Sequence, residues 1–321
     1  MDFSFLGGES DKYFLVFDIG NKSVSGAIVK RTPSRGGFSL GIVKSSKKEI
    51  SLGERVSFDA LLKNMAGALE ETAQSLFKEL PAKKIRAYAI LASPWHTSQT
   101  KIITLRKREP FVLDERIKNE VVERELSSFK DKVLDKNRHL ILMENNIIHA
   151  ALNGYDTVSY LGRKASEFKL ALYLSVTQNR VKEKILEKIG CFFPKAVITL
   201  HSFPLAYYSA IRDAFPGKND FLMMDVSGEI TDISLVRKGV LVETFSFPLG
   251  RNFLIRRMAS KTGATMREAE SLHALLSENM AGAAERKRLG EIAASAKIEW
   301  LKQFEKAVSD LSDELYVPEE I

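Results

Sequence analysis

Apolar and polar residues are distributed along the chain in a way that predicts an α/β protein. Short apolar runs that end at turn residues such as Gly, Asn and Asp predict strands. We expect strands at 13–20, 23–31, 38–46, 85–93, 101–107, 139–152, 169–176 and 196–200, and three more within 221–247. Apolar residues at helical spacing predict helices. We expect these at 56–79, 114–134, 179–189, 204–214, 250–260, 266–279 and 284–314.

The two ends of the chain differ from this pattern. Residues 1–11 contain Gly7 and Gly8 and resemble a flexible leader without a secretory signal. Residues 317–321 resemble the start of a strand, so we expect the native chain to continue past Ile321 with a strand, a Gly-rich turn and a helix. No stretch approaches the roughly 18 apolar residues of a membrane-spanning helix.

The order of the predicted elements divides the chain into three parts. Residues 12–95 and 179–215 form a first lobe with strands and helices of one style, and residues 216–321 form a second lobe. Between the two segments of the first lobe, residues 96–178 read as strand, helix, strand, strand, which predicts a compact insert.

A strand-turn-strand unit occurs twice. The segments FLVFDIGNKSVSGAIVK (14–30) and FLMMDVSGEITDISLVR (221–237) align without a gap, with Asp18 opposite Asp225 and Gly20 opposite Ser227. One such turn alone is more typical of an ordinary hairpin. A repeat at this separation favours two similar α/β lobes that face each other across a cleft.

The residue types at the two turns suggest a chemistry. Backbone N–H groups of small turn residues can clamp a polyphosphate, and carboxylates can hold hydrated Mg²⁺ near it. We therefore expect ATP and Mg²⁺ as ligands, with Asp18 and Asp225 as the metal residues.

Composition and charge exclude several classes of protein. The chain has 321 residues, of which 45% are hydrophobic and 28% charged, so it has enough apolar material for a globular core. The 48 Lys and Arg residues exceed the 41 Asp and Glu residues by seven, a balance that does not by itself indicate nucleic-acid binding. The one cysteine, Cys191, excludes an internal disulfide and a multi-cysteine zinc site and favours a cytoplasmic protein.

These motifs resemble the actin-like ATPase superfamily. Residues 18–23 (DIGNKS) are similar to its first phosphate motif, and residues 225–232 (DVSGEITD) to its second. The insert at 96–178 is similar to the module of the bacterial division protein FtsA and the pilus protein PilM. The resemblance implies two actin-like (ribonuclease H-like) lobes around a nucleotide cleft, with a small α+β insert in the first lobe and the last strands of the second lobe missing.

The resemblance also implies a nucleotide site. It combines both turns with the segment 249–276, which is similar to an FtsA segment with a Gly-Asn pair and a ribose contact. The implied residues are Asp18, Gly20, Asn21, Lys22, Ser23, Asp225, Ser227, Gly228, Thr231, Asp232, Gly250, Asn252, Glu270 and His273.

Three residues depart from the family pattern. Glu229 takes a place that is usually glycine, and its charge would repel a phosphate by about 1–4 kcal/mol if it pointed into the cleft. His273 stands where lysine is usual. Phe203 stands near the position of a water-orienting Glu or Gln, and a phenyl ring cannot take up a proton. We therefore assign no catalytic residue and expect at most a weak ATPase.

The resemblance implies a scaffold that binds ATP and Mg²⁺ between its lobes and recruits partners. An FtsA-type protein would contact a tubulin-like division protein, and a PilM-type protein the cytosolic tail of a membrane pilus protein. The Ala269-Glu270 pair favours the division branch. Self-association, and contact with the inner face of the cell membrane through a further C-terminal segment, are compatible with both. The alternatives are an active ATPase or kinase of the same fold and a nucleotide-free adaptor.

Overall fold

A computed structural model of the chain describes residues 12–34, 37–50, 57–80 and 85–312. Some sequence predictions lie outside these residues. They are the leader at 1–11, the beginning of the turn at 35–36, the first residue of the helix predicted from 56, and the strand expected from 317.

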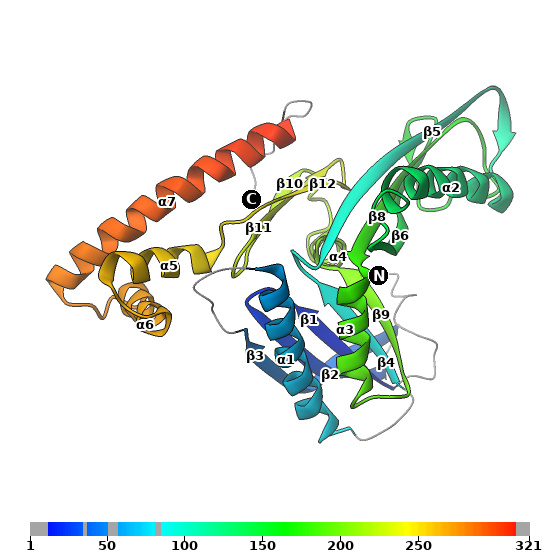
Figure 1. Cartoon of the computed structure of the whole chain (residues 1–321). Coiled ribbons are helices and arrows are strands. Elements are labelled where there is room, and N and C mark those ends of the chain that lie inside the picture. Colours follow the sequence, from blue (N-terminus) through cyan, green and yellow to red (C-terminus); the bar gives the residue numbers. More distant parts are fainter. Residues whose placement is uncertain (1–11, 35–36, 51–56, 81–84, 313–321) are drawn as a thin grey trace.

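The first lobe is built on a five-stranded sheet with the order β3-β2-β1-β4-β9 (Figure 1). Its strands are β1 (Tyr13–Ile19), β2 (Ser23–Ser34), β3 (Gly37–Glu49), β4 (Ile85–Leu91) and β9 (Ala196–Ser202). The first three strands form an antiparallel meander, whereas β4 runs parallel to β1 and β9 parallel to β4. The strands predicted at these positions are confirmed.

Two helices cover one face of this sheet. Helices α1 (Phe58–Phe77) and α3 (Asn179–Gly190) lie side by side over it (Figure 1). The side chain of Ser57 accepts a hydrogen bond from the Ala60 N–H and so caps α1. The buried faces of both helices join β1, β2 and β4 in the core of the first lobe, which includes Trp95. This core holds the first turn in place.

The insert is a four-stranded antiparallel sheet with the order β5-β8-β6-β7. Its elements are β5 (His96–Val112), α2 (Glu115–Phe129), η2 (Lys130–Leu134), β6 (Leu140–Leu152), β7 (Tyr155–Asp156) and β8 (Lys164–Gln178). Several details differ from the prediction: β5 and β8 are longer than 101–107 and 169–176, the helix predicted at 114–134 ends in the π-helix η2, and the short β7 was not predicted. Alternation along β5 is weak at its polar ends, so the pattern there carries little strand signal.

The second lobe combines a small sheet with helices. The sheet has the order β10-β11-β12 and contains β10 (Phe221–Val226), β11 (Thr231–Arg237) and β12 (Val240–Phe247). Three helices follow it: α5 (Arg251–Thr262), α6 (Met266–Ser277) and α7 (Ala283–Ser312). Helix α4 (Phe203–Ala214) precedes the sheet, in the segment predicted for the first lobe. Figure 1 shows α5, α6 and α7 extending from the sheet away from the insert. Trp300 and Phe304 of α7 pack on the sheet.

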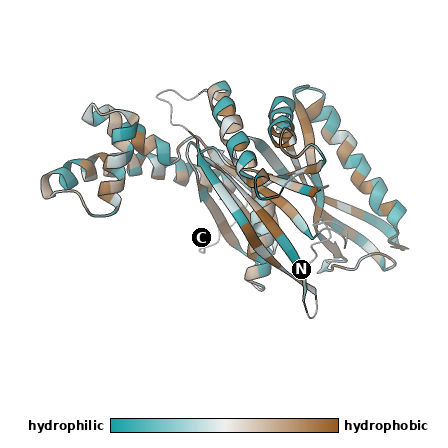
Figure 2. Cartoon of the chain, turned by 90° about the horizontal axis from the view of Figure 1, so that it is seen from below, coloured by the Kyte–Doolittle hydropathy of each residue, from teal (hydrophilic) through white to brown (hydrophobic). Residues whose placement is uncertain are grey.

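The apolar residues gather where the layers meet. In Figure 2 the strands near the centre carry most of the hydrophobic colour, whereas the helices show both colours along their length.

Among the described residues, no helix combines the length and the apolar character needed to cross a membrane. We use the names first lobe, insert and second lobe for the three predicted parts, and their boundaries stay a prediction.

Candidate functional site

The two hairpin turns lie directly against each other. The side chain of Asn21, in the first turn, is 1% exposed. Its Nδ2 donates a hydrogen bond to the carbonyl oxygen of Ser93 at 2.6 Å. Its Oδ1 accepts one from the backbone N–H of Glu229, in the second turn, at 2.7 Å. The expectation that the two turns face each other is confirmed, and Asn21 joins them.

The first turn is held by its backbone. The Gly20 N–H donates to the carbonyl of Ser23 at 3.1 Å, which closes the turn between β1 and β2. The Gly20 carbonyl accepts a hydrogen bond from the indole N–H of the buried Trp95 at 2.9 Å. The Lys22 carbonyl accepts one from the Ile50 N–H at 2.7 Å. These contacts fix the position of Asn21 at the tip of the turn.

The second turn rests on the beginning of α5. The N–H groups of Arg251 and Asn252 donate to the carbonyls of Ser227 and Gly228 at 2.9 and 2.8 Å. A helix N-terminus usually offers such N–H groups to a ligand or a cap. In this chain the second turn itself takes them. A Cβ at Gly250 would lie 2.4 Å from the Gly228 carbonyl oxygen, so this close approach requires glycine there.

Gly228 marks the tightest contact between the turns. A Cβ at this position would lie 2.9 Å from Asn21 Oδ1 and 3.0 Å from both Asn252 Nδ2 and Lys22 Cβ. Any larger residue would push the two turns apart. This close packing gives a physical reason for the one glycine that the second turn contains.

The Glu229 carboxylate is buried and paired with other side chains. Its carboxylate is 8% exposed and accepts a hydrogen bond from Asn252 Nδ2 at 2.8 Å. Both of its oxygens also accept from the guanidinium of Arg256, at 3.1 and 2.5 Å. The bidentate pair compensates the charge that we expected to repel a phosphate. Arg256 was not among the residues singled out from the sequence.

Three aspartates, Asp18, Asp225 and Asp232, lie on the strands next to the two turns. Asp225 and Asp232 lie opposite each other in the β10–β11 ladder. Burial, followed by the negative charges of Asp232 and Asp18, raises the pKa of Asp225 to about 6. Burial also raises the pKa of Asp18, although the nearby Lys47 opposes this. Asp18 and Asp225 are thus close enough to repel each other, which is the arrangement that the repeat predicted.

The remaining predicted residues lie around this centre. Burial lowers the pKa of His273, and the positive charges of Arg251 and Lys22 act in the same direction. His273 therefore lies near the first turn, and Glu270 lies 3.8 Å from Arg251. Thr231 has a structural contact: its hydroxyl donates to the Leu249 carbonyl at 2.7 Å and accepts from the Trp300 indole at 3.0 Å. Ser23 begins β2 at the end of the first turn.

These contacts decide how well ATP and Mg²⁺ fit the residues present. Carboxylates that repel one another suit a cation in principle. Within the described residues, however, no group of three or more His, Cys, Asp or Glu side chains is arranged to hold a metal ion. The Glu229 N–H is bonded to Asn21, and the first N–H groups of α5 are bonded to the second turn. In this arrangement a polyphosphate does not fit between the turns, and ATP and Mg²⁺ stay a prediction.

Phe203 has a packing role. It begins α4 and stacks on Tyr207, with ring centroids 5.3 Å apart. This contact supplies no group that could orient a water molecule.

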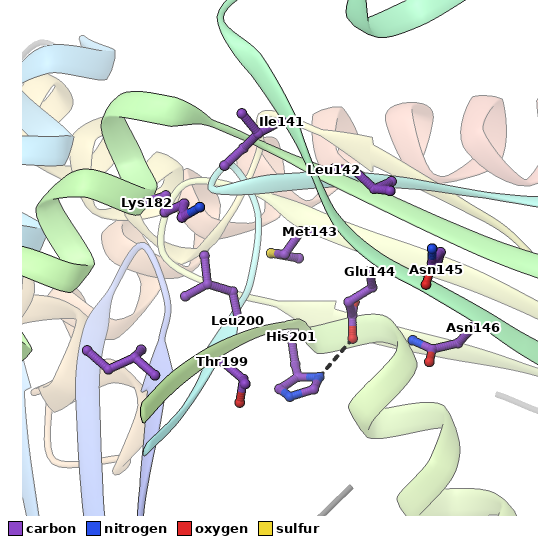
Figure 3. Close-up of a pocket in the computed structure, with 11 residues that line it drawn as sticks. Ile141, Leu142, Met143, Glu144, Asn145, Asn146, Lys182, Thr199, Leu200 and His201 are labelled. Carbon is purple, nitrogen blue, oxygen red and sulfur yellow. Dashed lines mark hydrogen bonds and ion pairs between the residues drawn. The ribbon is translucent and has the colours of Figure 1, made fainter. Parts of the chain in front are cut away.

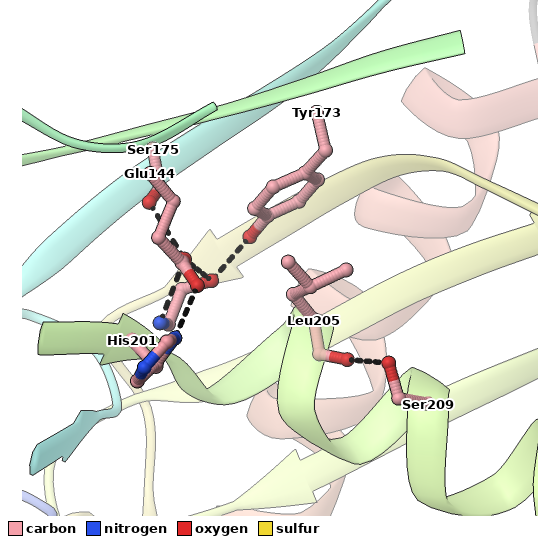
Figure 4. A network of polar contacts seen from close by, with 7 residues as sticks. Glu144, Tyr173, Ser175, His201, Leu205 and Ser209 are labelled. Atoms are coloured by element: carbon pink, nitrogen blue, oxygen red, sulfur yellow. Dashed lines mark hydrogen bonds and ion pairs between the residues drawn. The ribbon is translucent and has the colours of Figure 1, made fainter. Parts of the chain in front are cut away.

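A buried polar network that the sequence did not predict joins the insert to the first lobe (Figure 4). Glu144 Oε2 on β6 accepts hydrogen bonds from Ser175 Oγ at 2.9 Å, Ser202 N–H at 2.9 Å and Ser202 Oγ at 2.6 Å. Glu144 Oε1 lies 2.9 Å from His201 Nδ1. Since the Ser202 hydroxyl proton goes to Glu144, Tyr173 donates its own proton to Ser202. The signal that could have indicated this network is Glu144 itself, the one acidic residue in the apolar run 139–152.

Glu144 is ionised in this network. Burial opposes the charge, but the hydrogen bonds from His201 and Ser202 outweigh it and hold the pKa of Glu144 below its usual value. The network fixes β6 against the end of β9.

A pocket of about 460 Å³ opens beside this network (Figure 3). Its walls come from residues 141–146 of β6 and residues 198–201 of β9, and Lys182 of α3 lies at its border. Figure 3 shows the side chains of both strands around the pocket, with Glu144 and His201 joined. We call this pocket the β6–β9 groove.

Comparisons with known proteins give the fold. No protein-family model and no curated protein matches the sequence. Among solved structures, the chain is similar to a chain of a PilM-PilN type IV pilus biogenesis complex, with a TM-score of 0.60 and 14% identity. The alignment covers 95% of this chain and 79% of that one. This chain has the actin-like ATPase fold. The fold predicted from the sequence is confirmed.

Two other solved structures are more distant. EutJ, an ethanolamine utilization protein from Carboxydothermus hydrogenoformans, has 12% identity and a TM-score of 0.48, over 97% of this chain and 77% of that one. A Bacteroides thetaiotaomicron protein of unknown function with an actin-like ATPase fold has 15% identity and a TM-score of 0.38, over 83% and 81% of the two chains. Likeness at this level carries no argument about function.

Proposed function

We propose that this protein is a PilM-type scaffold that binds an extended peptide tail of a pilus assembly protein in the β6–β9 groove. The observation that carries the proposal is the groove itself, because two strands line it with edges that pair there with no other strand among the residues that the structure describes.

The strand edges at the groove are available for a peptide. In the part of the chain that the structure describes, β9 pairs only with β4 and ends its sheet. On the insert, β6 pairs with β8 on one side, and on the other side β7 pairs only with Ala151 and Leu152. Free strand edges bind extended peptides through main-chain hydrogen bonds, and side-chain pockets add specificity. The groove therefore favours an extended segment over a folded domain.

The groove is preformed. Glu144 joins β6 to Ser202 of β9 by two hydrogen bonds, so the two walls keep their separation without a ligand. A preformed site loses less conformational entropy on binding. Ile141 and Met143 offer apolar contacts, and Lys182 offers a positive charge at the border. These groups suit a tail that is largely apolar and has an acidic residue.

The fold agrees with a pilus partner. The structure with a TM-score of 0.60 is a complex of PilM with PilN in type IV pilus biogenesis. The division role that Ala269-Glu270 favoured has no comparable support, since Ala269 is fully buried as part of α6 and Glu270 pairs loosely with Arg251. The proposal implies a cytoplasmic protein at the inner face of the membrane, where such a tail would be reached.

Fluorescence anisotropy with a labelled peptide tests the proposal. The peptide is the cytosolic tail of an inner-membrane pilus assembly protein from the same organism. Leu142 lines the groove and is 36% exposed, so Leu142→Glu should keep the fold and weaken binding by about tenfold or more. Ile102→Glu is the matched control, because Ile102 on β5 is also exposed to solvent, at 49%, but does not line the groove.

The same assay separates the alternatives. Saturable binding that Leu142→Glu weakens and Ile102→Glu does not would support the proposal. Capture of a tubulin-like division protein, with no binding of the pilus tail, would overturn it and restore the division branch. Equal weakening by both variants would show that the peptide does not use the groove.

A further inference from the structure

We infer that the Asn21 side chain closes the two lobes in this chain in place of a nucleotide, so that lobe closure needs neither ATP nor Mg²⁺. We call the two hydrogen bonds of this side chain, to Ser93 and to Glu229, the Asn21 bridge. The inference goes beyond the proposed function, because it concerns the contact between the lobes and not the peptide groove.

The Asn21 bridge has the geometry of a built contact. The amide is 1% exposed, and one donor and one acceptor of it are used at 2.6 and 2.7 Å. It connects residues 208 positions apart in sequence. A buried amide that is satisfied on both sides stabilises the arrangement, whereas removal of one partner leaves a buried polar group without a bond.

A phosphate group would compete with this bridge for the same donor. The Glu229 N–H is a donor of the second turn that a phosphate oxygen could use, and Asn21 Oδ1 occupies it. The N–H groups at the start of α5 do not replace it, because they donate to Ser227 and Gly228. The turns are also too close, since a single added carbon at Gly228 would lie 2.9 Å from Asn21. A phosphate enters only if the bridge breaks and the lobes separate.

The charges around the turns also oppose a polyanion. Arg256, the cation that the second turn contacts, is paired with both oxygens of Glu229. Asp18 and Asp225 lie close enough to repel each other. Arg251 shares its charge with Glu270 at 3.8 Å, which leaves Lys22 as the cation of the first turn. The Glu229 N–H, the first N–H groups of α5 and the guanidinium of Arg256 are thus used inside the protein.

The first test uses the unaltered protein. Isothermal titration and thermal melting are measured with Mg-ATP and Mg-ADP at up to about 1 mM nucleotide. We expect no saturable heat and no rise in the melting temperature, because a ligand that binds the folded state must raise it. Saturable binding with a micromolar dissociation constant would overturn the inference, and it needs no variant to be seen.

The second test removes the bridge. Asn21→Ala should speed hydrogen exchange of the Glu229 amide by about tenfold or more, because this N–H then lacks its acceptor. Asn21→Asp keeps an acceptor for Glu229 but loses the donor to Ser93, so exchange should rise less. The control Asn137→Ala removes a hydrogen bond to the Val133 carbonyl wholly inside the insert and should leave the Glu229 amide unchanged.

Either result for Asn21→Ala is decisive. An unchanged Glu229 exchange rate would show that the bridge does not hold the turns together.

The third test repeats the peptide-binding assay of the proposed function with and without Mg-ATP. Equal affinity supports the inference. A nucleotide-dependent affinity would overturn it while leaving the proposed function intact, so the two can fail separately.

Discussion

The two lobes begin with the same hairpin and support it in different ways. The chain has two tryptophans, and each donates its indole N–H to one copy: Trp95 to the Gly20 carbonyl and Trp300 to the Thr231 hydroxyl. The first hairpin lies in a five-stranded sheet covered by α1 and α3. The second lies in a three-stranded sheet packed on α7. Similar local sequence is thus supported by two helices on a five-stranded sheet in one lobe, and in the other by a three-stranded sheet that packs on α7 in one cluster and on Tyr208 of α4 and Tyr173 of β8 in another.

The difference extends to the turns. The first turn is closed by backbone hydrogen bonds and the indole of Trp95. The second turn is closed by the equivalent backbone bond, from the Ser227 N–H to the Ile230 carbonyl at 3.0 Å, and it is supported further by the N–H groups of α5 and by the pair of Glu229 with Arg256. The Asn21 bridge joins the two turns, and the second sheet is also joined to α4 through the packing of Tyr208 with Phe221 and Leu241.

The largest expected effect comes from the two tryptophans. Trp95→Ala removes a side chain that is 1% exposed and should reduce the free energy of unfolding by about 3–5 kcal/mol. Trp300 is half-buried, so Trp300→Ala should cost about 1–3 kcal/mol. Urea unfolding measures both, and the tryptophan left in each variant reports on the other lobe by fluorescence. Equal losses would contradict the contrast between the lobes.

The ion pair of the second turn comes next. Arg256→Met leaves the carboxylate of Glu229 buried without its cation and should cost about 2–3 kcal/mol. Glu229→Gln in the same chain should recover part of this loss, because no uncompensated charge then remains. A double-mutant cycle measures the coupling. A coupling near zero would mean that solvent, and not Arg256, stabilises Glu229.

A smaller effect is expected from Asp225, and it depends on pH. The pKa of this carboxyl is raised from 3.8 to about 6 in the folded protein. The stability that protonation contributes is complete below about pH 3.8 and is lost as the pH rises through 6. Asp225→Asn should therefore be more stable than the parent by about 1–2 kcal/mol at pH 7 and equal to it near pH 3.5.

Thermal melting across this pH range checks the prediction for Asp225. Asp131→Asn, at an exposed aspartate of the insert, is the control and should show no such dependence. A constant difference between Asp225→Asn and the parent at all pH values would contradict the repulsion among the three aspartates.

The smallest effect is expected at Glu270. Its distance from Arg251 is 3.8 Å and its side chain is 46% exposed, so Glu270→Ala should change the free energy of unfolding by less than about 0.5 kcal/mol. The exposed pair of Glu79 with Lys44, at 3.4 Å, offers Glu79→Ala as a control of the same size. Loss of measurable nucleotide binding in Glu270→Ala would instead support the ribose contact that the sequence implied.

Much of the fold could be predicted from the sequence because its signals are local. The strand at 221–226 follows from an apolar run and its partner from apolar alternation, and α6 begins with a capping box formed by Thr265 and Glu268. The repeat also predicted that Asp18 and Asp225 come close together. The β6–β9 groove could not be predicted, since its walls are more than 50 residues apart and belong to different sheets.

The sequence by itself determined the order of strands and helices, the duplicated hairpin and the set of residues at the two turns. Only the tertiary structure decided what those residues contact. Asn21 meets Glu229, Arg256 pairs with Glu229, and Glu144 binds Ser202, and each contact crosses between elements. Periodicity reports which face of an element is apolar, but a polar side chain finds its partner only when packing brings a distant donor or acceptor within about 3 Å.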